Sequence, residues 1–289
     1  MDQQLDAISN EFYSSMSDSS MSDCIIAIAN QKGGVGKTTT AINLATALAA
    51  VGLKILIIDF DPQGNASTGL GVPLEKRSLG SYGLIHGTQI IEVVCSTQIP
   101  NLDLVPATVE LAGLEYELSE TSEPQYLLKK ALQKGEDKET DTNSTKSKYY
   151  DYVIIDCPPA LGLLTVNALV AADSLLVPLQ CEFFALEGLS QLLDIYQRVK
   201  TSFNSILEIE GVVLTMYDKR NNLSELVAED VRKHLGDKVY NTVIPRNVRV
   251  SEAPSFGRPV LLYDFNCAGA QAYVHLASEM LRRKEVALL

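Results

Sequence analysis

The chain has 289 residues, of which 46% are hydrophobic and 21% are charged, and its formal net charge is −12 at pH 7. This composition excludes a disordered protein, and the length is enough for one large α/β domain or two small ones. No apolar run reaches the roughly 18–20 residues of a membrane span, and the N-terminus lacks the basic-then-apolar pattern of a secretory signal. The acidic balance excludes a protein coated in positive charge, although a local basic patch can still steer a polyanion.

The cysteines favour a reducing compartment. Their number is odd, they are scattered, and none forms a C-x-x-C pair. Cys24, Cys157 and Cys181 lie in or beside apolar, strand-like runs. We therefore expect buried free thiols in the cytoplasm rather than disulfides or a cluster site.

The first half of the chain alternates between apolar runs and helical patterns. Residues 1–23 are rich in Ser and Asp and lack Lys and Arg, so we expect a disordered tail before a single domain at 24–285. The run "CIIAIAN" (24–30) predicts a buried parallel strand that ends at a glycine-rich loop. A helix is expected at 37–51, and a second buried strand at 54–61 carries acids at its carboxyl end.

The rest of the chain continues this alternation. A strand at 101–107 and a helical stretch at 109–133 precede a polar, low-complexity segment at 134–148, which we expect to be a solvated insert loop. Further strands are expected at 150–159, 173–179, 208–218 and 238–246, and further helices at 161–172, 185–203, 222–235 and 269–284. The alternation predicts a mostly parallel twisted sheet with helices on both faces, and such sheets bind ligands beyond the carboxyl ends of their strands.

The segment "QKGGVGKTTT" (31–40) predicts a phosphate-binding loop. The usual pattern G-x-x-x-x-G-K-[ST] fails at its first position, where Gln31 stands. The glycines let backbone N–H groups surround phosphate oxygens, Lys37 can reach the β- and γ-phosphates, and Thr38 offers a hydroxyl to Mg²⁺. The predicted nucleotide contacts are Gly33, Gly34, Val35, Gly36, Lys37, Thr38 and Thr39.

Carboxylates follow two of the expected strands. Asp156 closes the apolar run "YVIID" and is placed to hold the hydration shell of Mg²⁺. Asp59 and Asp61 lie two residues apart, so on a strand they project to the same face. An alternative is that Asp59 and Asp61 only cap the turn "DPQGN", which is rich in turn-forming residues.

The loop "KGGVGKTT" resembles that of the deviant-Walker ATPases, which include the ParA-type partition proteins and MinD. The resemblance implies a P-loop NTPase fold in which the extra lysine, here Lys32, crosses into a partner subunit and contacts the phosphates of its nucleotide. It implies that Asp61 orients the attacking water and that Asp59 supports the metal with Thr38 and Asp156. Lys32, Lys37 and Asp61 are thus the expected catalytic residues. The alternative for Lys32 is a solvated surface charge.

Two further loops follow the last two expected strands. By resemblance to relatives of this family, these loops line the adenine, and the candidates are Met216, Pro245 and Asn247. The alternative is that "IPRN" is only a turn at the end of a strand.

The blocks "DFDPQGNAS", "IIDCPPALGLLTVNAL" and "VIPRNVRVSEAPSFGRPV" resemble the chromosomal ParA/Soj type, over about residues 24–283. This resemblance implies an ATP-switched sandwich homodimer that binds double-stranded DNA without sequence preference. A ParB-type centromere-binding protein would stimulate its otherwise slow, Mg²⁺-dependent hydrolysis of ATP, which would drive chromosome or plasmid segregation in the cytoplasm, on the nucleoid. The implied DNA contacts are Arg220 and Arg249, with Lys219 and Arg246 as helpers. Ordinary solvated arginines are the alternative.

Two other functions of the same superfamily stay open at this point. A MinD-like regulator cycles on and off the membrane, but the tail "RRKEVALL" has too little apolar face to anchor the chain, so no membrane partner is predicted. A metabolic ATP-dependent ligase or amidase would transfer phosphate to a small acceptor, and such relatives generally lack a lysine like Lys32.

Overall fold

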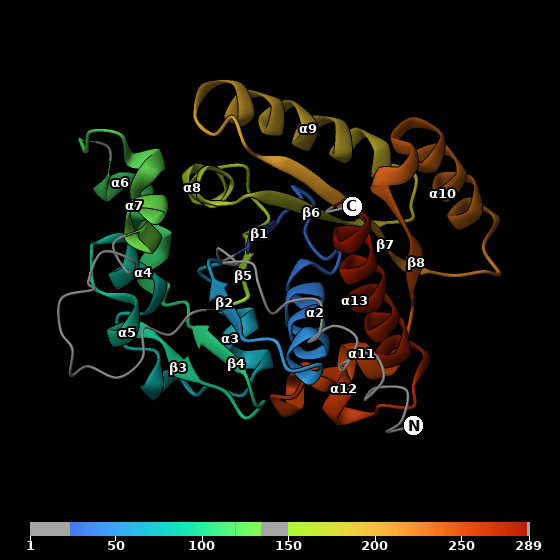
Figure 1. The fold of residues 1–289 in the computed structure, drawn as a ribbon, viewed down its shortest axis with the longest axis horizontal. Coiled ribbons are helices and arrows are strands. Elements are labelled where there is room, and N and C mark those ends of the chain that lie inside the picture. Colours follow the sequence, from blue (N-terminus) through green and yellow to red (C-terminus); the bar gives the residue numbers. More distant parts are fainter. Residues whose placement is uncertain (1–23, 119, 134–149, 288–289) are drawn as a thin grey trace.

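The computed structural model describes residues 24–118, 120–133 and 150–287 (Figure 1). The expected tail at 1–23 and the expected insert at 134–148 lie outside the described residues. One eight-stranded sheet forms the centre, in the order β3-β4-β2-β5-β1-β6-β7-β8. Neighbouring strands are parallel except for β3, which is antiparallel to β4. The expected α/β fold is confirmed.

The strands form where β-branched and other apolar residues run together, as expected for strands buried on both faces. Their bounds are β1 Cys24–Ile28, β2 Ile55–Asp59, β3 Cys95–Ser96, β4 Leu102–Val105, β5 Tyr152–Asp156, β6 Ser174–Gln180, β7 Glu208–Tyr217 and β8 Val239–Pro245. All strands predicted from the sequence are present. The two-residue β3 was not predicted, because so short an edge strand leaves no apolar pattern.

Helices cover both faces of the sheet (Figure 1). One face packs against α2 (Lys37–Ala50), α12 (Val260–Tyr263) and α13 (Ala268–Ala287). The other face packs against α7 (Leu127–Gln133), α8 (Leu163–Ala171), α9 (Ala185–Ser202) and α10 (Asn222–Leu235). Shorter helices occupy the connections: α3 Asn65–Gly69, α4 Gly80–Ile85, α5 Ile90–Val93, α6 Leu114–Glu117 and α11 Val248–Glu252.

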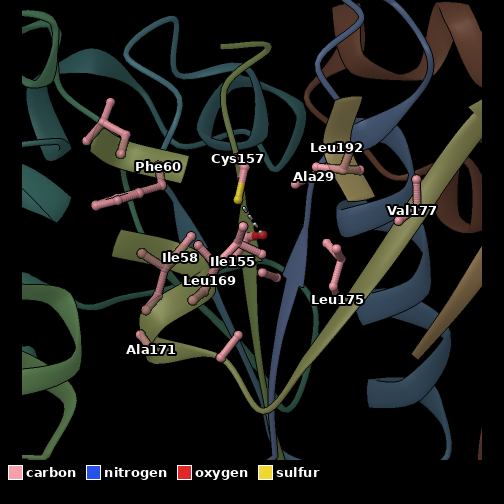
Figure 2. Close-up of a cluster of buried hydrophobic side chains, with 14 of the residues drawn as sticks. Ala29, Ile58, Phe60, Ile155, Cys157, Leu169, Ala171, Leu175, Val177 and Leu192 are labelled. Carbon is pink, nitrogen blue, oxygen red and sulfur yellow. Dashed lines mark hydrogen bonds between the residues drawn. The ribbon is translucent and has the colours of Figure 1, made fainter. Parts of the chain in front are cut away.

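The core has a layer on each side of the sheet. On the α8 and α9 side, Ile58 of β2, Ile155 of β5 and Leu169 of α8 are fully buried together (Figure 2). On the other side, α13 buries one apolar stripe: Tyr273, Leu276, Ala277, Met280 and Leu281. Both faces are therefore sealed, and the functional groups are left at the strand ends. No helix in the described ranges is both long enough and apolar enough to cross a bilayer.

Two expectations need correction. The single helical stretch expected at 109–133 is broken into a 3₁₀ turn (Val109–Gly113), α6, a second 3₁₀ turn (Pro124–Tyr126) and α7. Glu123 adopts a left-handed φ of 55° directly before Pro124, which has no N–H to continue a helix. All five cysteines are free, and Cys157 and Cys181 are buried as expected, but Cys24 is partly exposed.

Candidate nucleotide site

Strand order brings the predicted phosphate loop and the acids to one edge of the sheet. β5 lies between β1 and β2, with Ile28 opposite Asp156 and Asp156 opposite Asp59. The glycine-rich loop follows β1, so its residues and both aspartates lie at the carboxyl ends of three neighbouring strands. This is where ligands bind in parallel sheets of this kind.

The glycine-rich loop has the backbone conformation that only glycine adopts easily. Gly34 and Gly36 have φ values of 76° and 92°, and Gly36 is the N-cap of α2. A Cβ on Gly36 would lie 3.9 Å from the side chain of Thr215, so the requirement is conformational rather than steric. The N-terminus of α2 therefore opens onto the loop, where its N–H groups favour an anion.

Two polar residues that the sequence reading missed hold this loop in place. Asn30 donates from Nδ2 to the carbonyl of Pro178 (2.8 Å) and accepts from the backbone N–H of Lys32 (3.0 Å). Thr215 donates from Oγ1 to the carbonyl of Val35 (2.8 Å). The position of Asn30, directly after an apolar strand, is the sequence signal that could have identified it.

The ammonium of Lys37 lies inside the loop. The residue is only 6% exposed, and its Nζ donates to the backbone carbonyl of Lys32 at 3.1 Å. Burial lowers the pKa of Lys37, while the nearby negative groups, first among them Asp156, oppose that effect. A partly desolvated ammonium of this kind gains strongly from an anionic ligand such as a phosphate.

The carboxylate of Asp156 has the surroundings of a cation ligand. It is fully buried, and neither carboxylate oxygen has a hydrogen-bond partner among the described residues. Burial and then the charge of Asp59 raise the pKa of Asp156, and the adjacent Thr38 hydroxyl opposes the rise. Mg²⁺ prefers oxygen ligands and keeps several waters, so one hydroxyl and one carboxylate are a fitting donor set.

The carboxylate of Asp59, unlike that of Asp156, accepts hydrogen bonds from its own chain. Its Oδ2 accepts from the backbone N–H (2.8 Å) and the hydroxyl (2.6 Å) of Ser67, and its Oδ1 accepts from the N–H of Asp61 (3.4 Å). Burial raises the pKa of Asp59, and the Ser67 hydrogen bonds oppose the rise. These contacts match the alternative in which Asp59 only caps the turn that follows β2. A supporting role near the metal stays a prediction.

Asp61 lies just beyond β2, at the same edge. It is 6% exposed, and its Oδ1 accepts from the N–H of Gln63 at 3.0 Å. Its charge is close enough to raise the pKa of Lys37. Asp61 is thus a buried acid near Lys37, and its part in orienting water stays a prediction.

Lys32 is not a freely solvated charge. Its side chain, 42% exposed, forms an ion pair with Glu182, whose side chain is 29% exposed. Glu182 follows β6, the neighbour of β1 in the sheet, so the two loops adjoin. The sequence reading did not identify Glu182.

The adenine candidates follow β7 and β8. Met216 and Pro245 lie at adjacent strand ends, because Tyr217 is opposite Pro245 in the sheet. Met216 has a left-handed φ of 50°, and Asn247 caps α11 by accepting from the N–H of Arg249 (2.8 Å). All three candidates are partly exposed, and contact with a base stays a prediction.

The expected DNA contacts lie near the same strand ends but are already paired with acids. Arg220, with its side chain 89% exposed, donates from Nε and Nη2 to Asp218 at 3.0 and 2.9 Å, which lowers the pKa of Asp218 to about 2. Arg249 pairs with Glu252 (3.0 Å) and Asp264 (3.4 Å). The expected helpers, Lys219 and Arg246, are exposed. Binding of DNA here stays a prediction.

A cavity of about 760 Å³ lies at the opposite edge of the sheet. It is lined by residues that begin β6, β7 and β8, including Ser174, Glu208 and Val239. None of the predicted nucleotide-binding residues lines it, so it is a separate feature.

Comparison with known proteins decides the family. A family model described as an AAA domain matches residues 23–209. The chromosome partitioning protein ParA of Caulobacter vibrioides is 58% identical over 261 residues, which cover 90% of this chain and 94% of that protein. The chain belongs to the ParA/Soj family of partitioning ATPases.

A second curated protein and a solved structure are also similar to this chain. The sporulation initiation inhibitor protein Soj of Bacillus subtilis is 51% identical over 257 residues, 89% of this chain and 97% of that protein. The crystal structure of cobyrinic acid a,c-diamide synthase from Mycobacterium smegmatis, with bound ATP analogue and magnesium, has a TM-score of 0.76 and 34% identity. That match covers 91% of this chain and 96% of that structure. The expected P-loop fold of this family is thereby confirmed.

Proposed function

We propose that this chain is a Mg²⁺-dependent ATPase whose nucleotide state controls the segregation of chromosomal or plasmid DNA. The partition role is supported by the C. vibrioides relative, which is named a chromosome partitioning protein and whose match covers 90% of this chain. Binding of ATP and Mg²⁺ is supported by the orphaned carboxylate of Asp156 and by the M. smegmatis neighbour, which holds both kinds of ligand.

The observation that carries the proposal is the contrast between the two lysines of the loop. Lys37 is buried inside the loop, whereas the Lys32 side chain lies at its outer edge and is 42% exposed. In our proposal, Lys37 serves the chain's own nucleotide and Lys32 reaches the phosphates held by a second copy. ATP would then hold two copies face to face as a homodimer, and loss of the γ-phosphate would weaken the dimer.

Hydrolysis in this proposal depends on positioned groups rather than on a strong base. Bound Mg²⁺ would neutralise charge on the phosphates, with Thr38 and Asp156 holding the ion or its waters. Lys37 and the loop N–H groups would stabilise the developing charge, and Asp61 would orient the attacking water. We expect the rate to be slow until a ParB-type centromere-binding protein stimulates it.

The proposed DNA contact needs two copies. In one copy Arg220 and Arg249 are partly neutralised by neighbouring acids, and the chain as a whole is acidic. Pairing places two weak basic patches on one particle, and the second contact then gains from effective concentration. The dimer would therefore bind double-stranded DNA without sequence preference, on the nucleoid in the cytoplasm, whereas the single copy would not.

A second candidate is an ATP-dependent amidase or ligase, which the M. smegmatis neighbour favours. Such an enzyme would need a small acceptor and would turn over without pairing. Its identity to this chain is 34%, against 58% for the C. vibrioides relative, which favours the partition role.

The test is a pair of measurements, gel filtration and DNA mobility, each with ADP and with a slowly hydrolysed ATP analogue. We expect a dimer and retarded DNA with the analogue, and a monomer and free DNA with ADP. A monomer in both nucleotides, or DNA retarded equally in both, would contradict the switch.

A further inference from the structure

The ion pair of Lys32 with Glu182 (the Lys32–Glu182 pair) joins the loops after two neighbouring strands. The backbone around Glu182 is fixed, because its N–H donates to the carbonyl of Gln180 (2.9 Å) and its carbonyl accepts from Ala185 (3.0 Å). The backbone of Lys32 is fixed as well, by Asn30 on its N–H. Only the two side chains are free to change partner.

The backbone of Lys32 also contacts the other lysine of the loop. The Lys32 carbonyl accepts from the ammonium of Lys37 at 3.1 Å. In the proposed function Lys37 would turn to a bound phosphate and release this bond. The Lys32 side chain itself is directed by its ion pair with Glu182.

The surface beside this pair is apolar and open. Phe183 and Phe184 directly follow Glu182 and are 75% and 61% exposed, and their rings meet edge-to-face with centroids 5.1 Å apart. Two adjacent exposed aromatic side chains are typical of a surface that a partner covers. Since the proposed function places a second copy against Lys32, that copy would cover these rings too.

We propose that Glu182 is the resting partner of Lys32 in the single chain, and that pairing on ATP exchanges its carboxylate for a phosphate of the second copy's nucleotide. This inference rests on the proposed function, because it requires Lys32 to cross between copies. The carboxylate keeps the ammonium satisfied while no partner is present. It also opposes pairing, because two such ion pairs must open for each dimer that forms.

The charge-removing variant Glu182→Gln gives the direct test. Exposed ion pairs are weak, but two open per dimer, so we expect the dimer with a slowly hydrolysed ATP analogue to become about 2- to 30-fold tighter. Sedimentation velocity across a concentration series measures the dissociation constant. Glu187→Gln is the matched control, because Glu187 is exposed in the first turn of α9 and its change removes the same charge. The control should behave as the unchanged chain does.

A second variant, Glu182→Ala, should show the same gain and guards against an effect peculiar to glutamine. If neither variant forms a tighter dimer than the unchanged chain does, the inference is wrong and the proposed function still stands. Failure of the unchanged chain to pair with the analogue would instead contradict the proposed function. The gain should also shrink as salt rises, because screening weakens the Lys32–Glu182 pair in the unchanged chain.

Discussion

At the scale of single residues, the site is built around charges that are costly without a ligand. Asp156 is fully buried with no hydrogen bond to either oxygen among the described residues, and Lys37 is buried against a carbonyl. Both groups would be satisfied by a metal and phosphates. The ligand-free chain should therefore carry a stability cost at these positions that the bound chain does not.

Asp156→Asn tests this cost. The pKa of Asp156 is raised in the folded chain, so the folded state binds a proton more tightly than the unfolded state does, and stability is lost as pH rises through the folded pKa. Removing the charge should raise the free energy of unfolding at neutral pH by about 1–3 kcal/mol, and by less in acid. Urea unfolding of the ligand-free chain at several pH values measures it. Asp194→Asn, on the exposed face of α9, is the control, and a loss of stability in Asp156→Asn at neutral pH would contradict the account.

Asp61→Ala tests the water-orienting role. A positioned acid or base contributes about 10²–10⁴-fold to a rate, so stimulated ATP turnover should fall by about 100-fold or more, while pairing on ATP is kept. Asp61→Asn retains an acceptor for the N–H of Gln63 and should lose turnover as well. Phosphate release measured with the stimulating partner gives the rate, and normal turnover in either variant would remove Asp61 from this role.

At the scale of elements, the phosphate loop depends on a left-handed glycine at the start of α2. Gly36 has a φ of 92°, and a Cβ there would make only an ordinary contact with Thr215, at 3.9 Å. The left-handed region costs other residues about 1–2 kcal/mol. The start of α2 is thus set by backbone conformation rather than by packing.

Gly36→Ala should lower the free energy of unfolding of the ligand-free chain by about 1–2 kcal/mol and weaken nucleotide binding. Gly33→Ala is the matched control, because Gly33 has no positive φ and its Cβ would lie 4.0 Å from Pro159. Urea unfolding measures both variants. Equal losses in the two would mean that the conformation of Gly36 is not what shapes the loop.

The strands and helices also show how much of the fold could be predicted from the sequence. The strands were predictable, because runs such as "ILIID" can bury their apolar side chains only inside a sheet that is covered on both faces. The break before Pro124 was missed although the proline itself was a visible signal, since it has no N–H to continue a helix. The Lys32–Glu182 pair was out of reach as well, because it depends on β6 lying beside β1, and strand order is not written in local periodicity.

The candidate site also has features that the sequence predicts and features that it does not. It was predictable that the glycine-rich loop and Asp156 lie together, because the loop follows one apolar strand, Asp156 ends another, and strand ends meet at one edge. The hydrogen-bond partners of Asn30 and Thr215 were not predictable, because these bonds join segments far apart in sequence. The acids beside Arg220 and Arg249 were visible in the sequence but not as ion pairs, since pairing depends on side-chain direction.

At the scale of the whole molecule, DNA binding should depend on pairing and on salt. Each phosphate that a basic side chain neutralises contributes about −0.9 to the slope of log affinity against log salt concentration. Arg220→Ala removes one contact per chain, so the slope for the dimer should become less negative by about two such contributions, and the dimer should bind DNA more weakly at low salt. Fluorescence anisotropy with duplex DNA measures the slope. Arg198→Ala, exposed on α9, should leave it unchanged, and an unaltered slope in Arg220→Ala would clear that residue from the DNA surface.

The central claim is that Lys32 of one copy holds the nucleotide of another. Sedimentation velocity of Lys32→Ala with a slowly hydrolysed ATP analogue tests it most directly, with analogue binding measured in parallel. We predict that the variant binds the analogue through Lys37 and the glycine loop, yet stays a monomer where the unchanged chain is a dimer. A variant that pairs as tightly as the unchanged chain would contradict the account.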